Sequence, residues 1–195
     1  VGSEMCIRDR HNADGDKVVL NAAGVEAFNK KIIAASPTVY DMAAYPKTLS
    51  GKTVAAYVNT HTDLSDELYR EGKLVSDNYK NILRSQTNAA AIPAEVTVRY
   101  GVTVRRANLR NLPTGEGLFF YASDRNFDAL QETALDPGEA VAILHTSTNG
   151  YFYYVQAYNY RGWLSKFDVA ETDRSTWLRY AEPKNFLTVV SKDYT

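Results

Sequence analysis

Cysteine is almost missing from this chain, and the shortage excludes several kinds of chemistry. Cys6 is the single cysteine among 195 residues, so no disulfide can form within the chain and no thiolate metal site is possible. The three histidines, His11, His61 and His145, have no metal-ligand spacing. No glycine-rich phosphate loop occurs either. We therefore expect no metal site and no cofactor.

Long apolar runs and a surplus of either charge are missing as well. No run approaches the ~20 apolar residues that a membrane helix needs, so we expect no membrane span. Lys and Arg number 22 and Asp and Glu number 23, which leaves a formal net charge of −1 and no general attraction to nucleic acid. Hydrophobic residues make up 45% of the chain, which is enough for a buried core.

Tyrosine and, locally, arginine are plentiful. The chain holds 14 Tyr against 7 Phe and 2 Trp, and tyrosine suits half-exposed sheets and recognition surfaces because its ring is apolar and its tip polar. Between residues 96 and 115 no acid occurs, whereas four arginines do: Arg99, Arg105, Arg106 and Arg110. We favour a solvated strand face for this stretch, and the alternative is a site for carboxylate groups.

The patterning divides the chain into three segments. Residues 1–10 fit nothing that follows and resemble translated adaptor sequence, so we interpret them as a non-native leader, with any export signal lying outside the sequence. Residues 11–93 form a helical N-terminal segment. At the end of this segment the apolar period changes from helical to two, and residues 94–195 form a β domain.

Two or three helices are expected in the N-terminal segment, and three stretches are candidates. The first is capped by Asn21 and has apolar residues spaced by three and four. The second covers residues 53–58 and starts near Ser50. The third follows loop and cap chemistry at residues 63–66, runs to about residue 88 and presents one apolar face made of Val75, Tyr79, Ile82 and Leu83.

The β domain begins with alternating residues. From residue 96 to residue 104 apolar and polar side chains alternate, which is typical of a strand with one buried face. Gly101 in its middle indicates a bend or a bulge. After a helix capped by Asp173, a last strand is expected at residues 186–190.

Tight turns separate the strands between these two ends. Asp136-Pro137-Gly138 and Asn149-Gly150 are turn signals, and the second predicts a hairpin. The strands beside them cover residues 140–144, 151–158 and 160–164. Several short strands at close spacing predict a small barrel or a sandwich.

Several motifs occur in the order found in bacterial SH3-like domains. Residues 106–114 resemble the opening strand and loop, residues 127–135 the segment after the long first loop, and residues 136–147 the next strand. The turn Asn149-Gly150, the aromatic strand after it and the strand with Gly162-Trp163 are similar to the closing part of these barrels. The resemblance covers about residues 96–190. The family is the SH3-like domain of cysteine peptidases of the NlpC type, which cut peptidoglycan stem peptides.

This resemblance implies an α+β fold, namely a small SH3-like β-barrel preceded by a helical N-terminal segment. In such peptidases a papain-like domain usually follows the SH3-like part, and it needs a Cys nucleophile activated by a His. Cys6 lies in the leader, so we expect the chain to be no enzyme and the C-terminal peptidase domain to be missing beyond Thr195. The parent protein is expected in the cell envelope, either periplasmic or extracellular.

Two functions compete on these grounds. The first is a non-catalytic module that binds peptidoglycan or a muropeptide and targets a murein peptide hydrolase to the cell wall. The second is a structural module that docks on the peptidase domain and shapes its substrate groove. An independent enzyme ranks below both, because His145, Ser147 and Asp128 suggest a triad but nothing supplies a nucleophile elbow or an oxyanion hole.

The aromatic strand and its surroundings supply the candidate ligand-binding residues. One face of this strand must fill the barrel, and the other can form a ring-rich surface for sugars or peptides. The candidates are Tyr154, Tyr158, Tyr160, Asn149 and Arg106. The competing interpretation is that the rings cover the sheet against the N-terminal helices. Trp163 is expected in the core.

Overall fold

The computed structural model of the protein describes residues 17–60, 63–185 and 187. The chain forms two compact units, residues 1–37 and residues 38–195. The leader at residues 1–10 and the last expected strand at residues 186–190 lie outside the described residues, apart from residue 187, which has no regular structure. Cys6, His11 and His61 lie outside them too.

The first unit contains one described helix, α2 (Ala22–Ala35). The Asn21 side chain accepts a hydrogen bond from the Gly24 backbone N–H at 2.8 Å, so the predicted cap is confirmed. Ser36 ends the helix in an extended conformation, one residue before Pro37.

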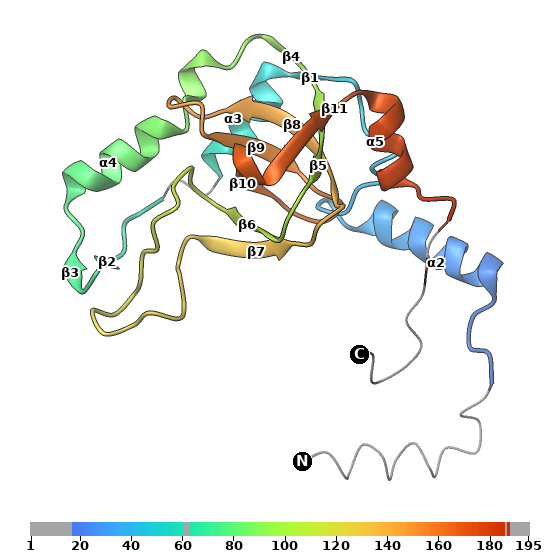
Figure 1. The fold of residues 1–195 in the computed structure, drawn as a ribbon, viewed down its shortest axis with the longest axis horizontal. Coiled ribbons are helices and arrows are strands. Elements are labelled where there is room, and N and C mark those ends of the chain that lie inside the picture. Colours follow the sequence, from blue (N-terminus) through green and yellow to red (C-terminus); the bar gives the residue numbers. More distant parts are fainter. Residues whose placement is uncertain (1–16, 61–62, 186, 188–195) are drawn as a thin grey trace. The chain divides into compact units, whose positions relative to one another are not determined.

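The second unit is built on an antiparallel sheet of seven strands in the order β11-β5-β8-β9-β10-β6-β7 (Figure 1). The mixed helix and strand content agrees with the expected α+β class, whereas closure of the sheet into a barrel stays a prediction. The strands are β5 (Arg99–Thr103), β6 (Ala107–Arg110), β7 (Gln131–Leu135), β8 (Ala140–Thr146), β9 (Phe152–Gln156), β10 (Arg161–Ser165) and β11 (Val169–Thr172).

The two tight turns of the sheet lie where the sequence places them. Gly138 and Gly150 have φ angles of 89° and 71°, a region that glycine adopts without strain. Gly150 belongs to the hairpin between β8 and β9, whose partners include Ile143 and Val155. The predicted hairpin and its two strands are therefore confirmed.

The strand expected from residue 96 to residue 104 is divided, which corrects the prediction. Its first part is β4 (Glu95–Thr97), which leaves the main sheet and pairs with β1 (Thr48–Ser50). Gly101 lies in the middle of β5 and makes no bend. A Cβ atom there would lie 2.5 Å from Cγ1 of Val169, so this glycine allows β11 to pack closely on β5.

The helices of this unit begin at polar caps. Helix α3 (Gly51–Asn59) is capped by Ser50, as predicted, and its first N–H, that of Gly51, donates to the Ala94 carbonyl at 2.7 Å. Helix α4 (Asp77–Gln86) is capped by Ser76 rather than by residues 63–66.

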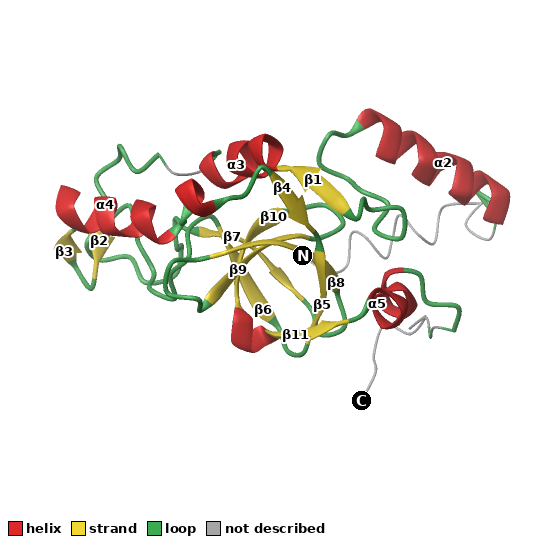
Figure 2. Ribbon diagram, turned by 90° about the horizontal axis from the view of Figure 1, so that it is seen from above, coloured by secondary structure: helices red, strands yellow, loops and turns green. Residues whose placement is uncertain are grey.

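The predicted helix is present, but the expected position of its cap is wrong, because a small hairpin of β2 (Tyr69–Arg70) and β3 (Lys73–Leu74) lies between residues 63–66 and the helix. Figure 2 shows this hairpin beside α4. The apolar face is also narrower than expected, since Ile82 is 48% exposed while Leu83 is buried.

Short helices complete the unit. They are η1 (Ala89–Ala91), η2 (Lys166–Asp168) and α5 (Arg174–Ala181). Asp173 caps α5 by accepting from the Thr176 N–H at 3.0 Å, as predicted. In the described parts of the chain, no helix combines the length and the apolar character that crossing a membrane requires.

The apolar core joins the helical segment to the sheet. Val54 and Val58 of α3 belong to one cluster with Tyr154 of β9 and with Trp163 and Trp177. Trp163 is 0% exposed, which confirms its expected place in the core. The division between residues 93 and 94 stays a prediction, and the two sides of it share this cluster.

Candidate functional site

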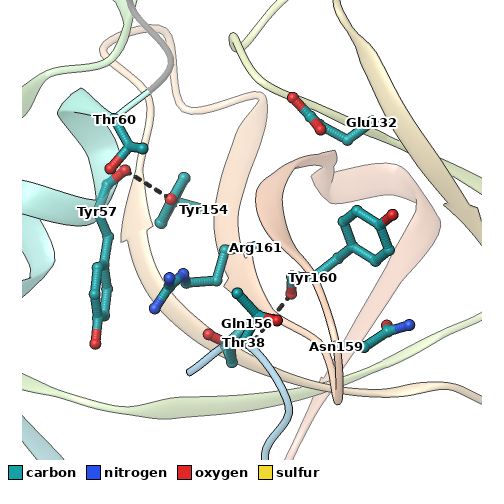
Figure 3. A pocket seen from close by; sticks show the side chains of 9 residues that line it. All are labelled: Thr38, Tyr57, Thr60, Glu132, Tyr154, Gln156, Asn159, Tyr160 and Arg161. Carbon is teal, nitrogen blue, oxygen red and sulfur yellow. Dashed lines mark hydrogen bonds between the residues drawn. The ribbon is translucent and has the colours of Figure 1, made fainter. Parts of the chain in front are cut away.

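A pocket of about 400 Å³ lies between α3 and the turn that joins β9 to β10 (Figure 3). Pockets of this size suit a small ligand or one segment of a larger one. Strands β7, β9 and β10, helix α3 and the chain before β1 contribute side chains. The residues that line it are Thr38, Tyr57, Thr60, Glu132, Tyr154, Gln156, Asn159, Tyr160 and Arg161.

Arg161 is the cation of this pocket, and aromatic groups hold it. Its guanidinium carbon lies 3.8 Å from the ring centre of Tyr57, and its Nη1 donates to the Tyr40 hydroxyl at 3.1 Å. The side chain is half-buried and forms no ion pair with any described residue. A partly buried, stacked guanidinium without a carboxylate partner among the described residues can bind an anion.

Two hydrogen bonds fix the wall behind Arg161. The Tyr154 hydroxyl donates to the Tyr57 carbonyl at 2.9 Å, which ties β9 to the end of α3. The Gln156 amide nitrogen donates to the Tyr160 carbonyl at 3.1 Å, which holds the turn into β10. Burial raises the pKa of the Tyr154 and Tyr57 phenols, so both remain neutral hydroxyl groups near pH 7.

The opposite side of the pocket is more open and carries a negative charge. Figure 3 shows Glu132 and Tyr160 across the pocket from Tyr57, with the Arg161 guanidinium on the Tyr57 side. Glu132 is exposed and, like Arg161, forms no ion pair within the described residues. Among the residues that the structure describes, the pocket thus presents one cation and one anion on different walls.

The structure brings together two of the five predicted ligand residues. Tyr154 and Tyr160 line the pocket, the first in its wall at 3% exposure and the second at its rim at 40% exposure. Tyr158 is exposed but does not line it. Asn149 accepts from the Ser147 hydroxyl in the β8–β9 turn, and Arg106 pairs with Asp136 at 2.5 Å. Ligand binding by these five residues remains a prediction.

Sequence reasoning missed Tyr57, Glu132 and Arg161. One sequence feature could have identified Arg161 as a candidate ligand residue. It directly precedes the Gly162-Trp163 motif, which places a cation at the start of that strand. No sequence signal links it to Tyr57, which lies far away along the chain. That contact depends on how α3 packs on β9 and β10.

The basic stretch does not form a carboxylate site of its own. Three of its arginines lie at the surface, as in the favoured interpretation, and Arg110 is buried. Each one pairs with an acid from elsewhere in the chain: Arg99 with Glu171, Arg105 with Asp168, Arg106 with Asp136 and Arg110 with Asp128.

The suspected triad is not assembled. His145 Nε2 donates to the Asn88 carbonyl at 3.0 Å, while the Ser147 hydroxyl donates to Asn149. Asp128 pairs with Arg110 at 2.7 Å. Among the described residues, no group of three or more His, Cys, Asp or Glu side chains could hold a metal ion.

Two comparisons with known proteins found a match, and the family match includes the strands beside the pocket. Residues 118–165 match the family described as SH3 domain (SH3b1 type). A solved structure of an NlpC/P60 endopeptidase from Photobacterium damselae subsp. piscicida superposes with a TM-score of 0.62 at 19% sequence identity, and the match covers 82% of this chain. No curated protein matches.

The chain spans 39% of the length of that endopeptidase, and at this identity the likeness concerns the fold alone. The family match begins in the long loop before β7 and ends with β10, so it includes the aromatic strand and the Gly162-Trp163 strand. Both findings confirm the resemblance drawn from the motifs. Residues 118–165 therefore match an SH3 domain of the SH3b1 type, and the fold of the chain is similar to that of part of an NlpC/P60 endopeptidase.

Proposed function

We propose that this chain is a non-catalytic, peptidoglycan-binding module of a murein peptide hydrolase, and that the pocket around Arg161 is its ligand site. The observation that carries the proposal is the Arg161 guanidinium, stacked on Tyr57 and without a carboxylate partner in the described residues. An SH3b1-type domain and the likeness to an NlpC/P60 endopeptidase support the peptidoglycan context.

The physical reason is that a half-buried cation is costly unless something pairs with it. Arg110 illustrates this, since this buried arginine has a carboxylate within 2.7 Å. Arg161 instead faces an open pocket with hydroxyl and amide groups around it. A ligand that carries a carboxylate would complete its pairing.

The proposal extends to the parent protein. We place it in the cell envelope, as a cysteine peptidase of the NlpC type whose catalytic domain is absent from this chain. The seven-stranded sheet then closes as a small barrel, with Tyr158 and Tyr160 at the edge of the ligand site. Fold analogy alone supports these points, and the pocket chemistry supports the ligand site.

A second function, docking on the peptidase domain, is favoured by a different surface. The long loop between β6 and β7 carries three exposed aromatic side chains, with exposures of 49% at Phe120, 71% at Tyr121 and 78% at Phe127. Large exposed aromatic groups are typical of surfaces that another protein covers. In this alternative the loop packs on the peptidase and the module shapes its substrate groove.

Sedimentation with purified peptidoglycan sacculi distinguishes the two functions. The full chain should appear in the pellet at moderate salt, and Arg161→Gln should remove most of it to the supernatant. Arg99→Gln is the matched control, because Arg99 also lies 4.9 Å from a tyrosine ring, that of Tyr153, but outside the pocket. A folded chain that stays in the supernatant would reject wall binding and leave docking.

A further inference from the structure

We infer that the pocket around Arg161 binds the stem peptide of peptidoglycan rather than its glycan strand, through a carboxylate at Arg161 and an ammonium group at Glu132. The inference rests on the proposed function and names the part of the polymer that is bound. It also assigns Tyr57, outside the matched SH3 segment, to the same site.

The carboxylate half of the site is built around a fixed guanidinium. A guanidinium carries five N–H donors in a planar fork, and the Tyr40 hydroxyl accepts from one nitrogen, Nη1. The Tyr57 ring at 3.8 Å holds the plane, which lowers the entropy lost when a ligand binds. The remaining donors match the two oxygens of a carboxylate, and partial burial strengthens that pairing relative to water.

The group that would bind the ammonium group of the ligand is the Glu132 carboxylate. This carboxylate lines the pocket from β7, it is exposed, and no cation among the described residues pairs with it. Because Arg161 and Glu132 lie on different walls, the pocket favours a ligand that carries both charges over one that is only anionic (Figure 3). A phosphate-rich polymer would be repelled by Glu132.

The peptide is the part of peptidoglycan that has this chemistry. Stem peptides offer free carboxylates and amino groups, whereas the sugar strand offers hydroxyl and acetamido groups that have no need of an unpaired arginine. The lining offers one exposed ring, that of Tyr160 at the rim, since Tyr154 is buried and the Tyr57 ring faces Arg161. Sugar rings usually bind to such open faces.

Titration of the full chain with soluble fragments tests the inference without changing the protein. The probes are a synthetic stem peptide with free carboxylates, the same peptide with its carboxylates amidated, the N-acetylated peptide, and the disaccharide without a peptide. Binding is followed by calorimetry and by NMR shifts of the pocket residues. The free peptide should bind, amidation should weaken it at least tenfold, and the disaccharide should not compete.

Variants then assign each charge to its partner. Amidation of the peptide carboxylates and the substitution Arg161→Gln should each weaken binding. Together they should weaken it no further than either alone, because both changes remove the same contact. N-acetylation and Glu132→Gln should behave in the same way. Arg161→Lys, which keeps the charge and loses the planar fork, should retain part of the affinity. Thermal melting of each variant shows whether it is folded.

The outcomes separate the inference from the proposed function. If the chain pellets with sacculi but the amidated peptide binds as well as the free one, or the disaccharide competes, the inference is overturned and wall binding stands. Additive losses in the two cycles would overturn the assignment of Arg161 and Glu132. A chain that binds neither sacculi nor any fragment would overturn both.

Discussion

The Arg110 guanidinium and the Asp128 carboxylate form an ion pair of 2.7 Å beneath the long loop that joins β6 to β7. Both side chains are largely buried, with 6% and 16% of their surfaces exposed. Asp128 also accepts the backbone N–H groups of Leu118 and Leu130, and Arg110 donates to the Glu116 carbonyl. The loop is thus organised around one buried pair.

Asp128→Asn should therefore be strongly destabilising. It leaves Arg110 buried without its counter-charge, and the loss of one partner from a buried pair costs about 3–5 kcal/mol. Urea unfolding followed by circular dichroism measures the change. Asp136→Asn is the control, since the Arg106–Asp136 pair is 69% and 68% exposed and such pairs contribute at most about 1 kcal/mol. Equal losses in the two variants would contradict the role given to the buried pair.

The two tryptophans should differ in what their indole nitrogens contribute. Both rings are 0% exposed, but Trp177 Nε1 donates to the Val141 carbonyl at 3.1 Å, whereas Trp163 Nε1 has no partner among the described residues. The substitution Trp177→Phe should thus lower the free energy of unfolding by about 1 kcal/mol more than Trp163→Phe does.

The substitution Trp163→Ala should lower the free energy of unfolding by about 3–5 kcal/mol, because it leaves a cavity. Chemical denaturation provides both values, and the reverse order for the two Phe variants would refute the assignment.

Gly162 should not tolerate a side chain. A Cβ atom at this position would lie 2.6 Å from the Arg110 carbonyl oxygen, on the strand that pairs with β10. Gly162→Ala should therefore push β6 and β10 apart and destabilise the fold by about 1–3 kcal/mol. Gly115→Ala is the matched variant, because nothing lies within 4 Å of a Cβ there. The melting temperatures of the two variants should differ clearly, and similar values would count against this explanation of the motif.

His145 should make the stability depend on pH. Burial lowers the pKa of its imidazole below the usual value of 6.5, so the unfolded chain takes up the proton more readily than the native state. The contribution of neutral His145 is complete above pH 6.5 and is lost as the pH falls through the lowered pKa. His145→Gln, which keeps a donor for the Asn88 carbonyl, should show a flatter profile between pH 7 and pH 5. Unfolding curves across this range compare the two, and parallel profiles would reject the effect.

Caps and turns were predictable because their hydrogen bonds are local. Asn21, Ser50 and Asp173 each accept from a backbone N–H three residues ahead, so the residue type and the next turn of sequence suffice. The Asn149-Gly150 hairpin is local in the same sense, since the turn sets the register of β8 and β9.

Features that depend on distant contacts were not predictable. The alternation at residues 96–104 has the period of one strand, yet β4 departs from β5 because β1 offers it a partner. The same limit applies to the candidate site. Tyr154 and Tyr160 were identified from a tyrosine-rich strand, whereas Tyr57 and Glu132 reach the pocket only through tertiary packing.

The pairing of β1 with β4 bears on how the domain can be isolated. The pairing of these strands and the hydrogen bond from the Gly51 N–H to the Ala94 carbonyl hold the two ends of residues 51–94 together. This segment is therefore a long insertion between two paired strands. A shortened chain that begins at residue 94 would lack β1. Strand β4 would then present an unpaired edge to solvent, and such an edge is a template for aggregation. A shortened domain should therefore begin before β1 (Thr48–Ser50) rather than at residue 94.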